Sequence, residues 1–132
     1  MFLSFTALSV VDCTQVPLIQ ELLALAFPHW SRQIPVRGKD NSWNYTGCGD
    51  TAGKQRHMAS AVEELVHGRD DLQITRRSTV LVDDDPANVR IALHNGVKSV
   101  WFMPETPESF PHQLNELATL VAGPDESRPT FV

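Results

Sequence analysis

The sequence predicts an α/β domain with a mostly parallel sheet of about four strands. Short runs of β-branched and aliphatic residues alternate with longer stretches whose apolar residues recur at helical spacing, which is the pattern of βαβ units. The chain has 132 residues, enough for one domain around a single core. Its composition, 42% hydrophobic and 20% charged, is typical of a folded domain. We therefore expect residues 1–132 to form one domain.

Four apolar runs are candidates for the strands. Residues 2–8 come first, and residues 33–36 follow as an edge strand, because Pro35 cannot donate a backbone hydrogen bond. Residues 78–82 form a continuous apolar run, which is typical of a strand buried on both faces. Residues 97–102 form another such run, in which Trp101 is expected to pack against the core.

Helices are predicted wherever apolar residues recur at a spacing of three and four. The stretches are residues 16–27, 54–68, 86–94 and 111–121. The first has Pro17 in its first turn and Pro28 after its end, two positions at which proline is tolerated. The second opens after Gly53 and is ended by Gly68. Residues 37–53, rich in glycine and asparagine, should form a surface loop long enough to carry function.

Charge and cysteine content argue against several functional classes. Eleven Lys and Arg against sixteen Asp and Glu give a net charge of −5, and the basic residues form no stripe, so we expect no nucleic-acid partner. Cys13 and Cys48 form neither a CxxC pair nor a disulfide framework, which favours a reducing, cytoplasmic compartment. No run approaches the roughly 18 apolar residues of a membrane span. Residues 1–13 lack the features of a signal peptide. We expect no membrane partner.

Three consecutive aspartates, Asp83, Asp84 and Asp85, separate a predicted strand from a predicted helix. In open α/β sheets, ligands bind outside the carboxyl ends of the strands. Adjacent carboxylates repel one another unless a cation or solvent takes up the charge, and hard oxygen ligands suit Mg²⁺ rather than zinc. Alternatively, Asp84 or Asp85 caps the helix that starts at Pro86. We favour metal binding, because a cap needs one carboxylate and not three.

The sequence at residues 79–89 reads TVLVDDDPANV, and a turn at Gly96 and a returning strand follow it. This segment resembles the fourth motif of the haloacid dehalogenase superfamily. The resemblance implies a Rossmann-like three-layer sandwich, Mg²⁺ as cofactor and a phosphoryl site beside the metal. It makes Asp83 the direct Mg²⁺ ligand, Asp84 a second acidic contact and Asn88 a supporting polar group.

Lys54 is in the chain order of the third motif of that superfamily, a lysine at the start of a helix. The resemblance implies that this lysine neutralises the nucleophilic aspartate and the transferred phosphoryl group. The alternative is an ordinary solvated lysine beside a helix. A phosphate loop of the form GxxxxGK[ST] is excluded, because Cys48 and Gln55 stand where it requires Gly and Ser or Thr.

Two hydroxyl residues, Ser4 and Thr6, lie in the first predicted strand. The second motif of the superfamily is a Ser or Thr at the end of a short strand, where it binds a phosphoryl oxygen. Ser4 and Thr6 both fit that place, and counting does not separate them. Either hydroxyl could instead form hydrogen bonds within its own strand.

The nucleophile is the missing part. The first motif of the superfamily is an apolar strand ending in DxDx[TV], which supplies the nucleophile and the general acid, and nothing precedes Met1 to supply it. The only substitute is Asp12, with Thr14 two positions further on. If Asp12 is the nucleophile, the second-motif candidates lie upstream of it, in the wrong order. We therefore favour a chain that begins at the second motif.

Two functions follow from this pattern. One is a Mg²⁺-dependent phosphohydrolase that forms an aspartyl-phosphate from a phosphorylated small molecule or a phosphoprotein. The other is a catalytically inactive relative that acts as a binding or oligomerising module, and the lack of a first motif favours it. The missing strand would be the central one, so we expect residues 8–11 to fill the gap or a homo-oligomer to cover it.

Overall fold

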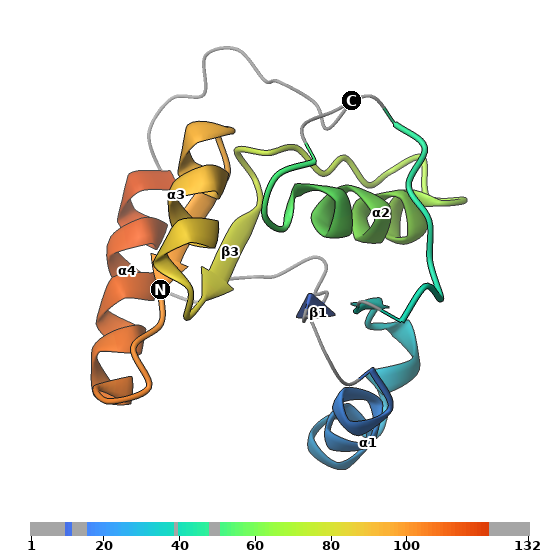
Figure 1. Cartoon of the computed structure of the whole chain (residues 1–132), viewed down its shortest axis with the longest axis horizontal. Helices are drawn as coiled ribbons and strands as arrows, with labels where there is room; N and C mark the ends of the chain where they lie inside the picture. The colour runs from blue at the N-terminus through green and yellow to red at the C-terminus, as the bar shows by residue number, and fades with distance from the viewer. Residues whose placement is uncertain (1–9, 12–15, 39, 48–50, 122–132) are drawn as a thin grey trace. The chain divides into compact units, whose positions relative to one another are not determined.

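The computed structural model describes residues 10–11, 16–38, 40–47 and 51–121 (Figure 1). The strands in this part of the chain are β1 (Val10–Val11), β2 (Val36–Arg37), β3 (Val80–Asp83) and β4 (Lys98–Trp101). They form two pairs, β1 with β2 and β3 with β4, and both pairs are parallel. The mixed α/β class and the parallel pairing are confirmed. The four strands pair two by two, however, and do not form one continuous sheet within the described residues.

The chain divides into two compact units. The elements of the first unit are β1, α1 (Val16–Ala26), β2 and α2 (Gln55–Val66). The elements of the second unit are β3, α3 (Pro86–His94), β4 and α4 (Phe110–Val121), together with residues 51–53. None of these helices, as far as the structure describes them, is both long and apolar enough to cross a membrane.

In the first unit, α1 connects the two strands of a parallel pair. Val10 lies opposite Val36, and Val11 lies opposite Arg37. The prediction for α1 is confirmed, because the helix begins at Val16 and stops before Pro28. One side of α1 buries Val16 and Leu23. On the opposite side, Leu18 is 48% exposed, Leu22 is 56% exposed and Leu25 is 81% exposed.

Strand β2 begins later than the sequence suggests. Ser31–Gln33 form a 3₁₀ turn, and only Val36 and Arg37 pair with β1. Pro35 has no N–H to contribute to a ladder, which explains why the strand starts after it. Arg37 was expected in the surface loop, and this expectation is wrong, because Arg37 ends β2 and is 8% exposed.

Helix α2 matches its predicted extent closely. It buries Met58, Ala59 and Ala61. The Trp43 ring packs against His57 of α2 with the ring centres 4.6 Å apart, and its indole N–H donates to the carbonyl of Gly38 over 2.6 Å. These contacts attach part of the predicted loop to the first unit.

In the second unit, β3 starts at Val80 rather than at Ser78. Thr75 and Ser78 hydrogen-bond each other, and the Thr79 hydroxyl donates to the carbonyl of Thr75 over 2.8 Å. Side-chain bonds of this kind compete with strand pairing and hold these residues in a turn. The strand was expected to be buried on both faces, but Val82 is 43% exposed while Leu81 is 7% exposed.

Helix α3 packs on both strands of this unit and has the predicted bounds. Ala92 of α3 and Val97 and Val100 near β4 form its core and are at most 3% exposed. Helix α4 packs on β4, where the rings of Phe102 and Phe110 meet edge to face with centres 5.7 Å apart.

Two further strand predictions concern the N-terminal residues 2–8 and 8–11. The strand expected at residues 2–8 lies outside the described residues. Of the run at residues 8–11, Val10 and Val11 form a strand, and its partner is β2.

Candidate functional site

The three aspartates follow β3, at the carboxyl end of the strand, as the sequence predicts. Asp83 is the last residue of β3 and is half-buried, whereas Asp84 and Asp85 are exposed. Strand β3 ends here, and after Asp84 the chain enters α3, which Asp85 caps and Pro86 begins. The site is therefore a strand-to-helix turn that carries three consecutive aspartates.

The carboxylate of Asp83 is held by hydrogen bonds from two residues. Asn88 donates its side-chain amide to both carboxylate oxygens, over 3.2 and 3.3 Å. The backbone N–H of Asp85 donates to Oδ1 over 2.9 Å. An ionised carboxylate has about four acceptor positions, so Asp83 keeps acceptor capacity for a cation.

Asp85 performs the capping role that the sequence left open between Asp84 and Asp85. Its side chain accepts a hydrogen bond from the backbone N–H of Ala87 over 2.8 Å, and it is the N-cap of α3. The Asp84 carbonyl accepts a hydrogen bond from the indole of Trp101 over 3.0 Å. Asp85 thus caps the helix, while the Asp83 side chain accepts hydrogen bonds from Asn88 and from the backbone of Asp85.

The turn before α2 approaches this site through Gly53, which belongs to the same unit as α3. A Cβ at Gly53 would lie 3.1 Å from Oδ1 of Asn88 and 3.2 Å from Cδ1 of Ile91. Gly53 also has φ +55°, a conformation that favours glycine. Glycine at this position permits the close approach to Asn88.

Lys54 directly precedes α2, at the position that the sequence predicts. The alternative of a solvated lysine is wrong, because Lys54 is 6% exposed. Lysine is rarely buried to this extent unless a partner compensates the charge. Lys54 belongs to the first unit, and the acidic turn belongs to the second.

The remaining candidates, Ser4, Thr6 and Asp12, lie outside the described residues. Of these three, only Asp12 directly follows a residue that the structure describes. Strand β1 ends at Val11, one residue before Asp12, and its parallel partner β2 precedes Lys54 in the chain. Strand β2 therefore lies between Asp12 and Lys54 in the chain, whereas Ser4 and Thr6 still precede Asp12.

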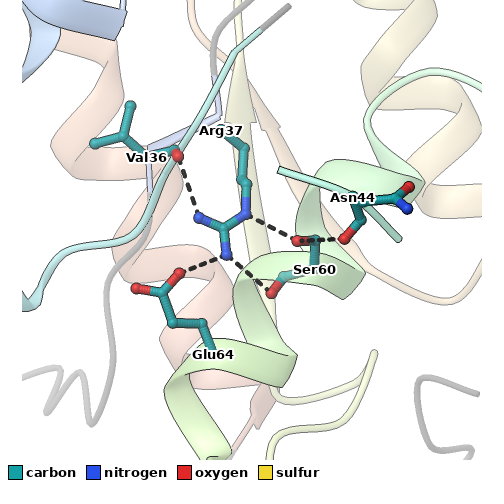
Figure 2. A network of polar contacts seen from close by, with 5 residues as sticks. All are labelled: Val36, Arg37, Asn44, Ser60 and Glu64. Carbon is teal, nitrogen blue, oxygen red and sulfur yellow. Dashed lines mark hydrogen bonds and ion pairs between the residues drawn. The ribbon is translucent and has the colours of Figure 1, made fainter. Parts of the chain in front are cut away.

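Sequence reasoning missed a buried network around Arg37 (Figure 2). The guanidinium of Arg37 donates to Oγ of Ser60 over 2.9 Å and to the carbonyl of Ser60 over 3.2 Å. It also donates to Glu64 over 2.5 Å and to the carbonyl of Val36 over 3.2 Å. The Ser60 hydroxyl lies 3.5 Å from the carbonyl of Asn44. The network connects β2 to α2.

The donor set at the end of β3 fits Mg²⁺. Among the described residues, no three His, Cys, Asp or Glu side chains gather as a potential metal-binding group. Mg²⁺ does not require such a group, because it is usually held by one or two carboxylates, with water and substrate phosphate completing its shell. Asp83 and Asp84 supply two carboxylates, and Asn88 orients the first of them.

Comparison with known proteins adds no relative: no family model, curated protein or solved structure matches this chain.

Proposed function

We propose that the protein is a Mg²⁺-dependent phosphohydrolase that resembles the haloacid dehalogenase superfamily. The observation that carries the proposal is the Asp83 carboxylate at the carboxyl end of β3, oriented by Asn88 and followed at once by a capped helix.

Each residue has a part in the proposed reaction. A carboxylate oxygen of Asp12 attacks phosphorus, the bond from phosphorus to the leaving oxygen breaks, and the leaving oxygen takes a proton from water. Water then attacks phosphorus of the aspartyl-phosphate, which releases inorganic phosphate and restores the carboxylate. Lys54 binds the phosphoryl oxygens in this proposal. Asp83 and Asp84 would hold Mg²⁺, and the metal would neutralise charge on the phosphoryl oxygens.

Thr14 stands two residues after Asp12, where the resemblance expects a second acid. The proposal therefore includes no side chain that protonates the leaving group. In the proposal, the hydroxyl of Thr6 or Ser4 donates a hydrogen bond to a phosphoryl oxygen. We also propose a Rossmann-like three-layer sandwich for the fold and a cytoplasmic location. The proposed substrate is a phosphorylated small molecule or a phosphoprotein.

Turnover of 4-nitrophenyl phosphate with and without Mg²⁺ tests the proposal. We expect Mg²⁺-dependent turnover that Asp12→Asn and Asp83→Asn each reduce to background. Asp71→Asn is a matched control, because Asp71 is exposed and is not one of the residues proposed to act in catalysis or metal binding. Turnover that survives Asp12→Asn, or no turnover in the wild-type protein at any Mg²⁺ concentration, would refute the proposal.

A second candidate function is a catalytically inactive oligomerising module, and one observation favours it. Leu18, Leu22 and Leu25 form an apolar stripe on the exposed side of α1. Contiguous apolar surface of this kind marks interaction sites. Sedimentation at micromolar concentration tests this candidate: a dimer that Leu22→Gln dissociates supports it, and a wild-type monomer contradicts it.

A further inference from the structure

Trp101 lies next to the acidic turn and is not used by the proposed function. It is the last residue of β4 and pairs in register with Asp83 of β3. Paired residues of neighbouring strands project from the same face of a sheet, so the indole and the Asp83 carboxylate share one face. The sequence suggested a packed tryptophan, but Trp101 is 46% exposed.

The indole is fixed in place by its only polar atom. Its N–H donates to the carbonyl of Asp84 over 3.0 Å, and tryptophan has no other hydrogen-bonding group. The remaining exposed surface of the ring is therefore flat and apolar. A single exposed aromatic residue is ordinary on a protein surface. Trp101 differs because a hydrogen bond ties its ring to one of the two aspartates proposed to hold Mg²⁺.

We propose that Trp101 is the surface on which an aromatic leaving group stacks, so that the substrate is an aryl phosphate monoester. This inference rests on the proposed function. The chemistry agrees with it, because the proposed reaction assigns no side chain to protonate the leaving oxygen. When the P–O bond breaks, its electron pair goes to the aryl ester oxygen, and the group leaves as phenolate. Phenolate is a good leaving group because its conjugate phenol has a pKa of about 10, as in tyrosine, and it then takes a proton from water. Stacking on Trp101 holds the aryl group while the bond breaks.

The kinetic test compares two aryl phosphates whose phenols have similar pKa but whose rings differ in size, phenyl phosphate and 2-naphthyl phosphate. The measured quantity is the ratio of their kcat/KM values, naphthyl over phenyl. We expect Trp101→Leu to lower this ratio by about 3- to 10-fold, which is the range of aromatic pair interactions. Trp101→Phe keeps an aromatic face and should retain most of the ratio. Trp30→Leu, at another exposed tryptophan, is the control and should leave the ratio unchanged.

A binding experiment separates this inference from the proposed function. The probe is 4-nitrophenylphosphonate, an analogue that is not hydrolysed and whose ring quenches tryptophan fluorescence, in the presence of Mg²⁺. We expect saturable quenching that Trp101→Leu abolishes and Trp30→Leu does not. Methylphosphonate should cause no quenching.

The outcomes are distinct. Absence of turnover together with quenching that depends on Trp101 would refute the phosphohydrolase and still support an aryl-binding site. Turnover with an unchanged naphthyl to phenyl ratio in Trp101→Leu, or quenching that persists in this variant, would overturn the inference. A phosphotyrosine peptide, compared with phenyl phosphate, identifies the source of the aryl group. A higher kcat/KM for the peptide supports a protein substrate, and a lower one supports a small molecule.

Discussion

Asn88 donates its side-chain amide to both carboxylate oxygens of Asp83, over 3.2 and 3.3 Å. Asp83 ends β3, and Asn88 lies in the first turn of α3, so the contact crosses the strand-to-helix turn. A carboxylate held from one side presents its remaining lone pairs in a fixed direction. Partners that orient a metal ligand in this way contribute to metal affinity without touching the metal.

Asn88→Ala should weaken Mg²⁺ binding by about 10- to 100-fold, the usual effect of removing such a partner. Mg²⁺ that binds the folded protein raises its melting temperature by mass action, so the dissociation constant is obtained from melting temperatures over a Mg²⁺ titration. Asp83→Asn should abolish the shift, and EDTA should reverse it. His94→Ala, at an exposed position of the same helix, serves as the control. An equal Mg²⁺ response in wild type and Asn88→Ala would contradict the assigned role.

Asp85→Ala should destabilise the protein by about 1 kcal/mol, because it removes the N-cap bond to Ala87. Asp85→Ser keeps an oxygen that accepts this bond and should recover most of the loss. Urea unfolding in EDTA measures both variants without a contribution from bound metal. Asp84→Ala is the matched control and should change stability by less than about 0.5 kcal/mol. Equal losses in the two alanine variants would show that charge, rather than capping, determines the stability of this turn.

The Arg37 network predicts an order of stabilities. Arg37→Ala should cost about 2 to 4 kcal/mol, because it leaves a cavity and removes the donors that serve Ser60. Glu64→Gln should cost less than about 1 kcal/mol, because the Glu64 side chain is 56% exposed and water screens its ion pair. Chemical denaturation measures both. A cost for Glu64→Gln that equals that of Arg37→Ala would assign the stabilisation to the ion pair.

Local patterns in the sequence predicted α3 well and the Arg37 network not at all. The bounds of α3 follow from neighbours in the chain: a capping aspartate, a proline in the first turn, and Gly96 with φ +78° after its end. The partners of Arg37 are 23 and 27 residues away, and no periodicity connects an arginine at the end of a strand to them.

In the candidate site too, features set by neighbours in the chain could be predicted and features set by distant segments could not. The aspartates at the end of β3 could be placed from the apolar run before them. The burial of Lys54 and the exposure of Trp101 could not, because both depend on packing between distant segments. The late start of β3 is an intermediate case. Hydroxyl groups at Thr75, Ser78 and Thr79 compete with strand pairing, which residue type alone could have suggested.

Asp40 should titrate at a lower pH than an ordinary aspartate. Hydrogen bonds from the side chain and the backbone N–H of Ser42 hold the pKa of Asp40 below its usual value of 3.8. Because the pKa is lower in the folded protein, the resulting stabilisation is present above pH 3.8 and is lost as the pH falls through the folded pKa. Ser42→Ala should move the pKa of Asp40 toward 3.8, measured by NMR titration of its carboxyl carbon. A pKa that does not change in Ser42→Ala would contradict this cause.

Gly53→Ala and Gly68→Ala form a matched pair that isolates the contact between Gly53 and Asn88. Both glycines have positive φ, +55° and +71°, so alanine at either position costs about 1 to 2 kcal/mol of backbone strain. Both substitutions also restrict the unfolded chain to a similar degree. At Gly68 the new Cβ would meet nothing within 4 Å. The difference between the two variants therefore reports on the surroundings of Gly53.

Gly53→Ala should cost about 1 kcal/mol more than Gly68→Ala, because its Cβ would press on Asn88 Oδ1 at 3.1 Å and Ile91 Cδ1 at 3.2 Å. Displacement of Asn88 also disturbs the amide that orients Asp83, so Gly53→Ala should weaken Mg²⁺ binding while Gly68→Ala leaves it unchanged. Urea unfolding in EDTA gives the first difference, and the Mg²⁺ titration of melting temperature gives the second. Equal stabilities together with equal Mg²⁺ responses would mean that alanine at position 53 is accommodated without moving Asn88, and that the turn before α2 has no influence on the acidic turn.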